Sequence, residues 1–212
     1  MTVLFPARLV MSGALVSLLA GCAGFPFGKT PPDTYELSAP ANVRAAAPAV
    51  HRRQLLIPAP SALKALSSNQ VVVRTSPSAI QYLSDSQWSD TLTSMVQARL
   101  IQAYEETGKV GGVGRPGDGL AIDFRILTDI RAFSVSTVGS PRATVDIAVR
   151  ILNDRNGVVV DQRDFRAVSP VSGTGNPAFI TALNRAFDKT LAEIVGWTLE
   201  KIARVKPEAA ES

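Results

Sequence analysis

Cysteine and histidine are nearly absent from this chain, whose 212 residues include one of each, Cys22 and His51. Zinc and other transition-metal sites draw on several thiolate and imidazole ligands, so a metal site here would have to use carboxylates alone. Because Cys22 lies at the end of an N-terminal leader, the chain beyond it offers neither a disulfide nor a cysteine nucleophile. We therefore expect no metal and no cofactor.

Catalytic groups are equally scarce. A Ser-His-Asp triad would have to use His51, which lies beside Arg52 and Arg53 in a stretch without periodic apolar residues, and we interpret it as a solvated linker residue. The aspartates at predicted strand or turn positions are expected to be solvated charges of a polar sheet face or its hairpins: Asp123, Asp129, Asp146, Asp154, Asp161 and Asp164. The sequence thus predicts a protein that is not an enzyme, and a periplasmic hydrolase is the weakest alternative.

Long basic runs are also missing. Lys and Arg total 22 against 18 Asp and Glu, and no basic run exceeds Arg52-Arg53. Aromatic residues are few and are not interleaved with the charges, so the pattern of a nucleic-acid-binding surface is absent. We place the two tryptophans, Trp88 and Trp197, in the core or at its edge rather than in a ligand platform.

An apolar run without charge does occur at the start of the chain, between Arg8 and Cys22. It is about a dozen residues long, whereas a spanning helix needs about 20. Its basic start, apolar middle and small-residue exit predict a secretory signal peptide over residues 1–21. A membrane-spanning segment is the poorer interpretation.

The four residues Leu19-Ala20-Gly21-Cys22 resemble the bacterial lipobox, whose cysteine becomes the new N-terminus and carries acyl chains such as palmitate. Each buried CH₂ of an acyl chain contributes about 0.8 kcal/mol, so several chains hold a domain at a membrane durably. The sequence therefore predicts lipidation of Cys22, the alternative being a free thiol in an unprocessed leader. Ala23 in place of Asp resembles lipoproteins sorted to the periplasmic side of the outer membrane.

The composition divides the rest of the chain into three parts. Residues 22–50 are rich in Pro and Ala and are predicted to be a lipidated, extended tether, interrupted by an alternating triplet, Tyr35-Glu36-Leu37. Residues 51–206 carry periodic apolar patterns and are predicted to form one domain, and residues 207–212 a frayed tail.

Two helical stripes stand out within that domain. Apolar residues at steps of three and four predict a helix between Ser86 and Thr107, with N-cap oxygens at Ser84 to Ser86 and a left-handed end at Gly108. A second helix is predicted from an N-cap at Asn176 and Pro177 to about Ile202. Its stripe consists of Ile180, Leu183, Phe187, Leu191, Ile194, Thr198 and Ile202.

Alternating residues predict a three-stranded meander over 120–133, 144–151 and 158–168, with a hairpin at Asn153–Gly157 and a bulge after Val160. Earlier apolar segments, 54–58, 70–75 and 79–83, are expected to add strands to its sheet. The result is an α+β, two-layer fold, an antiparallel sheet with two long amphipathic helices packed on one face.

A glycine-rich segment joins the first helix to the meander. It contains the spacing G-x-G-x-x-G at Gly112, Gly114 and Gly117. In a dinucleotide site that spacing follows a strand and opens a helix, whereas here it follows a helix and leads into a strand. We therefore predict a plain, flexible loop over Gly108–Gly119.

Several stretches taken together resemble one family. They are "TYEL" soon after the cysteine, "AIQYLSDSQWSDTLTSMVQARLIQAYEETGKV", "LAIDFRILTDIRAF", "VDIAVRILNDRNGVVVDQRDFRAVSPV" and "ALNRAFDKTLAEIVGW". Their order and spacing resemble the ABC-type transport auxiliary lipoproteins, the PqiC-like family, from Tyr35 to Trp197. The resemblance implies a non-catalytic subunit that docks or stabilises the periplasmic part of an intermembrane lipid transporter, and it transfers no binding residue beyond Cys22.

The same resemblance implies the partners: an MCE-domain protein, its ABC permease and ATPase, and phospholipid as a candidate cargo. A stand-alone lipoprotein that binds a lipid or another hydrophobic ligand remains as the alternative, and a homo-oligomer is left open. The site residue predicted by both routes is Cys22, as the attachment point to the membrane.

Overall fold

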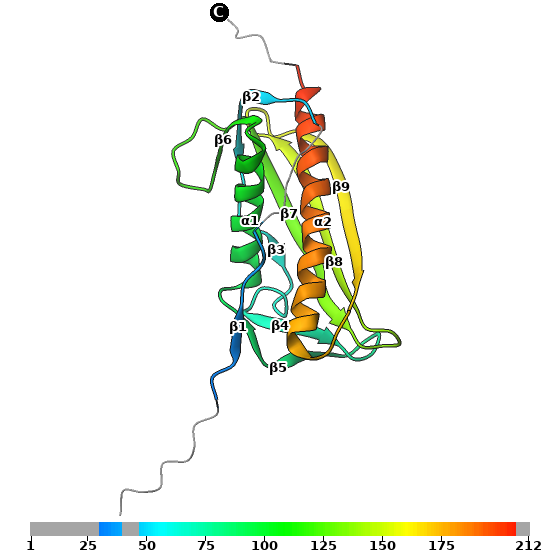
Figure 1. Cartoon of the computed structure of the whole chain (residues 1–212). Helices are drawn as coiled ribbons and strands as arrows, with labels where there is room; N and C mark the ends of the chain where they lie inside the picture. The colour runs from blue at the N-terminus through cyan, green and yellow to red at the C-terminus, as the bar shows by residue number, and fades with distance from the viewer. Residues whose placement is uncertain (1–29, 40–46, 207–212) are drawn as a thin grey trace, which may run out of the picture. The chain divides into compact units, whose positions relative to one another are not determined.

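Nine strands and two helices follow one another in the part of the chain that this computed structural model describes, residues 30–39 and 47–206 (Figure 1). The strands are β1 (Asp33–Tyr35), β2 (Val50–Leu56), β3 (Ser61–Ala62), β4 (Gln70–Arg74), β5 (Ile80–Trp88), β6 (Val110–Gly114), β7 (Phe124–Ser136), β8 (Arg142–Asn153) and β9 (Val159–Pro170). The helices are α1 (Leu92–Thr107) and α2 (Gly175–Ala203). The α+β class predicted from the sequence is confirmed.

The long strand β7 organises the sheet. One of its edges pairs with β8 in antiparallel fashion, and β8 pairs in the same way with β9, which confirms the predicted meander. The other edge pairs with β2, β3 and β4 in succession, all parallel to β7. The earlier strands therefore do join the meander, and they make the sheet mixed rather than antiparallel throughout.

The predicted bulge in β9 is present. Ile151 pairs with Asp161 and Leu152 pairs with Val159, so Val160 is the extra residue between them. The apolar residues of β8 alternate with polar ones and are buried at Val145, Ile147 and Ile151. One face of the meander is thus apolar and the other polar, as its alternation indicates.

The first described segment packs with the folded unit. Asp33 to Tyr35 form β1, which runs parallel to β5, and Leu37 is buried in the core. The guanidinium of Arg99 in α1 donates to the carbonyl of Leu37 at 2.8 Å. This stretch lies within the predicted tether, and the triplet noted there supplies both a strand residue, Tyr35, and the buried Leu37.

Helix α1 begins later than its stripe suggests. Ser84 to Trp88 continue strand β5, so the predicted N-cap residues and Trp88 are not helical. The N-cap is Thr91, whose side chain accepts a hydrogen bond from the backbone N–H of Ser94. Trp88 fits the helical period by coincidence, because it lies four residues before Leu92 and is buried from the strand instead. Gly108 ends the helix in the left-handed conformation, as predicted.

The segment predicted as a loop after α1 contains a strand, β6, which pairs in parallel with β2. A side chain at Gly111 would place its Cβ 2.4 Å from the carbonyl oxygen of His51, so glycine permits this close approach of two backbones. Gly112 and Gly114 lie in the same strand, which excludes a phosphate-binding loop at these residues.

Helix α2 covers the meander. It packs on β7, β8 and β9, and α1 lies beside it on the same face of the sheet (Figure 1). The predicted stripe is confirmed, since each of its residues is buried. Fully burying one such Leu, Ile or Phe side chain contributes roughly 1.5–3 kcal/mol, so this stripe holds the two layers together. The N-cap is Thr174 rather than Asn176, which lies inside the first turn.

Aromatic side chains fill the space between the layers. Phe133 contacts Trp88 with ring centroids 6.0 Å apart and Phe187 with centroids 5.7 Å apart. Trp197 meets Phe165 at 5.3 Å. Both tryptophans are therefore core residues, as expected.

Candidate functional site

The site residue predicted from the sequence, Cys22, lies outside the described residues, as do the whole of the signal peptide and most of the tether. Neither helix in the described chain has the length and apolar character needed to cross a bilayer. Within this part of the chain, no three His, Cys, Asp or Glu side chains are grouped as metal ligands. The remaining candidates are the buried charges and the hollows of the folded unit.

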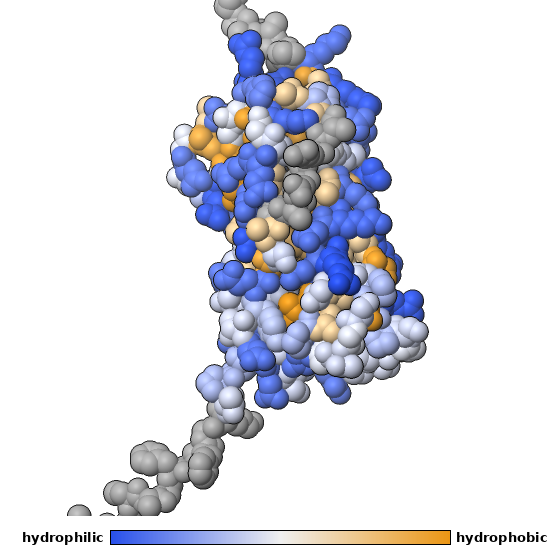
Figure 2. Space-filling model, viewed as in Figure 1, coloured by the Kyte–Doolittle hydropathy of each residue, from blue (hydrophilic) through white to orange (hydrophobic). Residues whose placement is uncertain are grey.

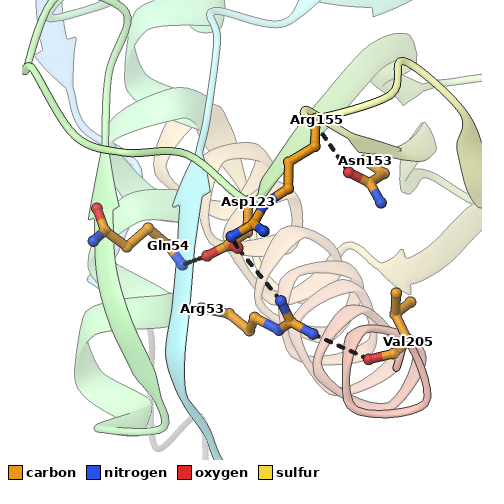
Figure 3. Close-up of polar contacts among 6 residues, drawn as sticks. All are labelled: Arg53, Gln54, Asp123, Asn153, Arg155 and Val205. Carbon is orange, nitrogen blue, oxygen red and sulfur yellow. Dashed lines mark hydrogen bonds and ion pairs between the residues drawn. The ribbon is translucent and has the colours of Figure 1, made fainter. Parts of the chain in front are cut away.

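A buried carboxylate, Asp123, forms the centre of the most connected polar cluster (Figure 3). Its Oδ2 accepts a hydrogen bond from the backbone N–H of Gln54 in β2 at 2.9 Å. Its Oδ1 accepts from Arg155 at 3.0 Å and from Arg53 at 3.4 Å. Because the Asp123 side chain is only 8% exposed, both arginines neutralise a charge that has lost most of its water.

Arg53 extends the cluster to the end of the chain. Its guanidinium also donates to the carbonyl of Val205, just after α2, at 3.1 Å and lies 5.6 Å from the ring centroid of Phe124. The cluster thus connects β2, the start of β7, the β8–β9 hairpin and the end of α2. The expectation that Asp123 is a solvated sheet charge is wrong, because β7 begins only at Phe124 and the preceding residue turns inward.

An open hollow of about 840 Å³ lies beside this cluster. Its wall includes His51, Arg52, Arg53 and Arg155, together with apolar Ile202. His51 belongs to β2, with an exposed side chain, and is not the linker residue expected from the sequence. Three arginines against one carboxylate that is already paired give this wall an excess of positive charge, which suits an acidic group or an acidic protein surface better than an acyl chain.

A second open hollow, of about 620 Å³, lies on the polar face of the sheet. There Arg131 pairs with Asp164 at 2.6 Å and with Asp129 at 3.7 Å. The hydrogen bond that Arg131 donates to Asp164 raises the pKa of Arg131 above its ordinary value. These side chains are about half exposed, so the prediction of solvated sheet charges holds here, and solvent screening leaves such pairs little effect on stability.

A separate ion pair joins strand β9 to helix α2. Lys201 in α2 pairs with Asp161 in β9 at 2.6 Å, and this hydrogen bond lowers the pKa of Asp161. The structure brings Asp161 to the helix, not to Asp123, so the six aspartates singled out in the sequence do not converge on one site. Sequence reasoning missed the Asp123 cluster, and its one signal, the adjacent Arg52-Arg53 pair, was assigned to a linker.

Known proteins with a similar structure or sequence indicate the family of this chain. A crystal structure of a Xanthomonas campestris protein of the family DUF330 is similar, with 28% identity and a TM-score of 0.74, over 81% of this chain and 97% of that one. A second crystal structure shares the fold at 15% identity and a TM-score of 0.63, over 80% of this chain and 99% of that one.

Among curated sequences, an uncharacterized protein of Bradyrhizobium diazoefficiens is 31% identical over 193 residues, which are 89% of this chain. The chain spans about half the length of that relative, 51%. The family model described as the ABC-type transport auxiliary lipoprotein component matches residues 35–195, from the end of β1 to the last third of α2. The chain therefore belongs to the family of ABC-type transport auxiliary lipoproteins.

Proposed function

We propose that this protein is a non-catalytic auxiliary subunit of an ABC-type intermembrane lipid transporter. It is anchored through acylated Cys22, faces the periplasm from the outer membrane, and docks or stabilises the periplasmic part of the transporter. Its partners are the MCE-domain protein and, through it, the ABC permease and ATPase. The observation that carries the proposal is the family match, which spans nearly the whole folded unit.

The chemistry of the buried cluster supports a structural rather than a catalytic role for Asp123. A general acid or base needs a lone pair or a proton that can reach a substrate. Asp123 already accepts three hydrogen bonds, from Gln54, Arg53 and Arg155, and has little exposed surface. It therefore fixes the position of the two arginines on the wall of the hollow.

The hollow beside that cluster is the proposed contact surface for the transporter. Arg52 is exposed on its wall and Arg155 is 58% exposed at the side chain, so both reach solvent. Opposite charges across an interface raise the association rate and fix the register of the partners. We expect the surface that binds here to carry carboxylates.

The test is purification of the tagged, membrane-extracted protein, with co-purified proteins and lipids identified by mass spectrometry. Recovery of an MCE-domain protein with its permease and ATPase supports the proposal. Lipid recovered without a transporter favours the alternative, a stand-alone lipid-binding lipoprotein. Density-gradient separation of the two membranes tests the outer-membrane placement, which recovery in the inner-membrane fraction would contradict.

A charge reversal locates the contact. Arg52→Glu is expected to lower the recovery of the transporter, because it reverses one charge on the wall of the hollow without touching the Asp123 cluster. Arg185→Glu is the matched control, since Arg185 is an exposed arginine of α2 that does not line this hollow. Equal recovery with both variants would place the contact elsewhere.

A further inference from the structure

Three loops meet at the end of the molecule opposite the Asp123 cluster, at the bottom of Figure 1. They are residues 75–79 between β4 and β5, 137–141 between β7 and β8, and 171–175 between β9 and α2. The backbone N–H of Thr137 donates to the carbonyl of Arg74 at 3.0 Å, and that of Val171 donates to the carbonyl of Pro141 at 3.1 Å. The three loops are therefore neighbours, and we call them the loop end.

The three loops themselves contain no charged residue, and two arginines flank them: Arg142 follows the second loop, and the guanidinium of Arg74 donates to the carbonyl of Pro77 in the first loop at 3.0 Å. The loops read Thr-Ser-Pro-Ser-Ala, Thr-Val-Gly-Ser-Pro and Val-Ser-Gly-Thr-Gly. Figure 2 shows the lower right part of the molecule pale, whereas the upper half is largely blue. At the opposite end, by contrast, the hairpin carries Asp154 and Arg155, and the last residues of α2 are followed by Arg204 and Lys206.

Large apolar side chains are exposed beside these loops. Val138, in the β7–β8 hairpin, is 43% exposed, and Ile80 and Tyr82 at the start of β5 are 42% and 48% exposed. Ile80 pairs with Arg74 at the end of β4, so it adjoins the first loop. This composition suits the interface between lipid headgroups and acyl chains, because it combines valine and isoleucine with a tyrosine and with uncharged hydroxyl residues.

The chain also enters the folded unit at this end. Asp33 pairs with Ser86 in β5, and the side-chain amide of Asn176, in the first turn of α2, donates to the hydroxyl of Ser86 at 2.8 Å. Asp33 follows Cys22 by eleven positions in the sequence. At roughly 3.3–3.6 Å per residue, that stretch reaches at most about 36–40 Å.

That reach is shorter than the folded unit. Helix α2 has 29 residues. At 1.5 Å per residue it is about 43 Å long, and the Asp123 cluster lies at its far end. The loop end, where the chain enters the folded unit, is therefore the end that a membrane attached at Cys22 reaches most readily.

We infer that the loop end rests on the lipid surface that holds Cys22, with Val138, Ile80 and Tyr82 at the level of the headgroups. The inference rests on the proposed acylation of Cys22. The contact is weak by itself, but the short tether keeps the surface at a high effective concentration next to the bilayer. Asp85 lies further along β5, and its charged carboxylate disfavours burial in the bilayer. The contact is therefore confined to the loops and the first residues of that strand.

The test uses the full chain, expressed with its leader and reconstituted in vesicles of phosphatidylethanolamine and phosphatidylglycerol. Cys22 is blocked by its acyl chain, so a Val138→Cys variant takes a polarity-sensitive fluorophore at one position. The expected result is blue-shifted emission that is quenched by lipids carrying a spin label at the headgroup. Val158→Cys is the matched control, an exposed valine in the hairpin at the opposite end, and its emission should not change.

Flotation of the vesicles separates the two ways in which the idea can fail. A wild-type protein that does not float with the vesicles overturns the acylation of Cys22 and this inference together. A protein that floats but gives equal emission from both labelled positions overturns the lipid contact and leaves the anchor intact. In the labelled Val138→Cys variant, adding Tyr82→Asp should abolish the blue shift, because it places a charge at the headgroup level without removing the anchor.

Discussion

Removing the carboxylate of Asp123 should be among the most damaging single changes in the folded unit. Asp123→Ala leaves Arg53, whose side chain is 17% exposed, without its ion pair and leaves the backbone N–H of Gln54 without its acceptor. Breaking a buried ion pair by removing one partner costs about 3–5 kcal/mol. Asp123→Asn keeps a side-chain oxygen for Gln54, so its cost should be lower, about 1–3 kcal/mol.

The assay is equilibrium urea denaturation, followed by the fluorescence of Trp88 and Trp197, which are buried in the native state. Asp164→Ala is the control, because it removes a carboxylate from a solvent-exposed pair with Arg131 and should change stability far less than Asp123→Ala. The reasoning is refuted if Asp123→Ala costs no more than this control. A result in which Asp123→Asn is as damaging as Asp123→Ala would assign the loss to charge alone and not to the acceptor.

Three further predictions follow from single positions. Burial raises the pKa of Tyr104 well above its ordinary value, so the folded state holds a proton that the unfolded state releases above about pH 10. Above that pH the free energy of unfolding should fall by about 1.4 kcal/mol per pH unit. Tyr104→Phe should remove this part of the slope in urea titrations at alkaline pH. Gly111→Ala should destabilise the protein by roughly 1–3 kcal/mol because its Cβ would press on the carbonyl of His51, while Gly112→Ala, with its nearest neighbour at 3.9 Å, should cost less in the same urea assay. Cys22→Ser should release the protein into the soluble fraction with an unchanged circular dichroism spectrum, and a soluble but unfolded product would contradict the separation of anchor and core.

The sequence predicts those parts of the fold in which the local spacing of apolar and polar residues reflects which side chains are buried. The stripe of α2, the alternation of β8 and the extra residue at Val160 are all local patterns, and the structure confirms them. Strand β6 gives no such signal, because three of its five residues are glycines that have no side chain to alternate. Its place in the sheet depends on the close approach of Gly111 to β2, which lies far away in the sequence.

The candidate site was hidden for the same reason. Asp123 continues the alternation of a strand pattern, and nothing in its neighbours reveals that the strand begins one residue later. Its partners come from β2, the β8–β9 hairpin and the end of α2, so only the assembled fold shows them together. Buried charges of this kind are set by tertiary contacts, whereas the lipobox-like segment ending at Cys22 is a purely local pattern, so its prediction does not depend on the fold.

The two ends of the folded unit differ in chemistry in a way that matches the two tasks proposed for them. The apolar level of a bilayer disfavours fixed charges, because each would lose water without gaining a fixed partner, and the three loops themselves have none; the flanking Arg74 and Arg142 suit the level of the lipid phosphates. A contact with another protein in the periplasm benefits from charges, since these steer its approach over about a Debye length, roughly 8 Å at physiological ionic strength. On the proposals made above, the eleven positions from Cys22 to Asp33 would keep the loop end next to the membrane, and the arginines beside Asp123 would then lie about the length of α2 away from it. On the same proposals, the length of α2 would set the distance between the membrane and the transporter contact.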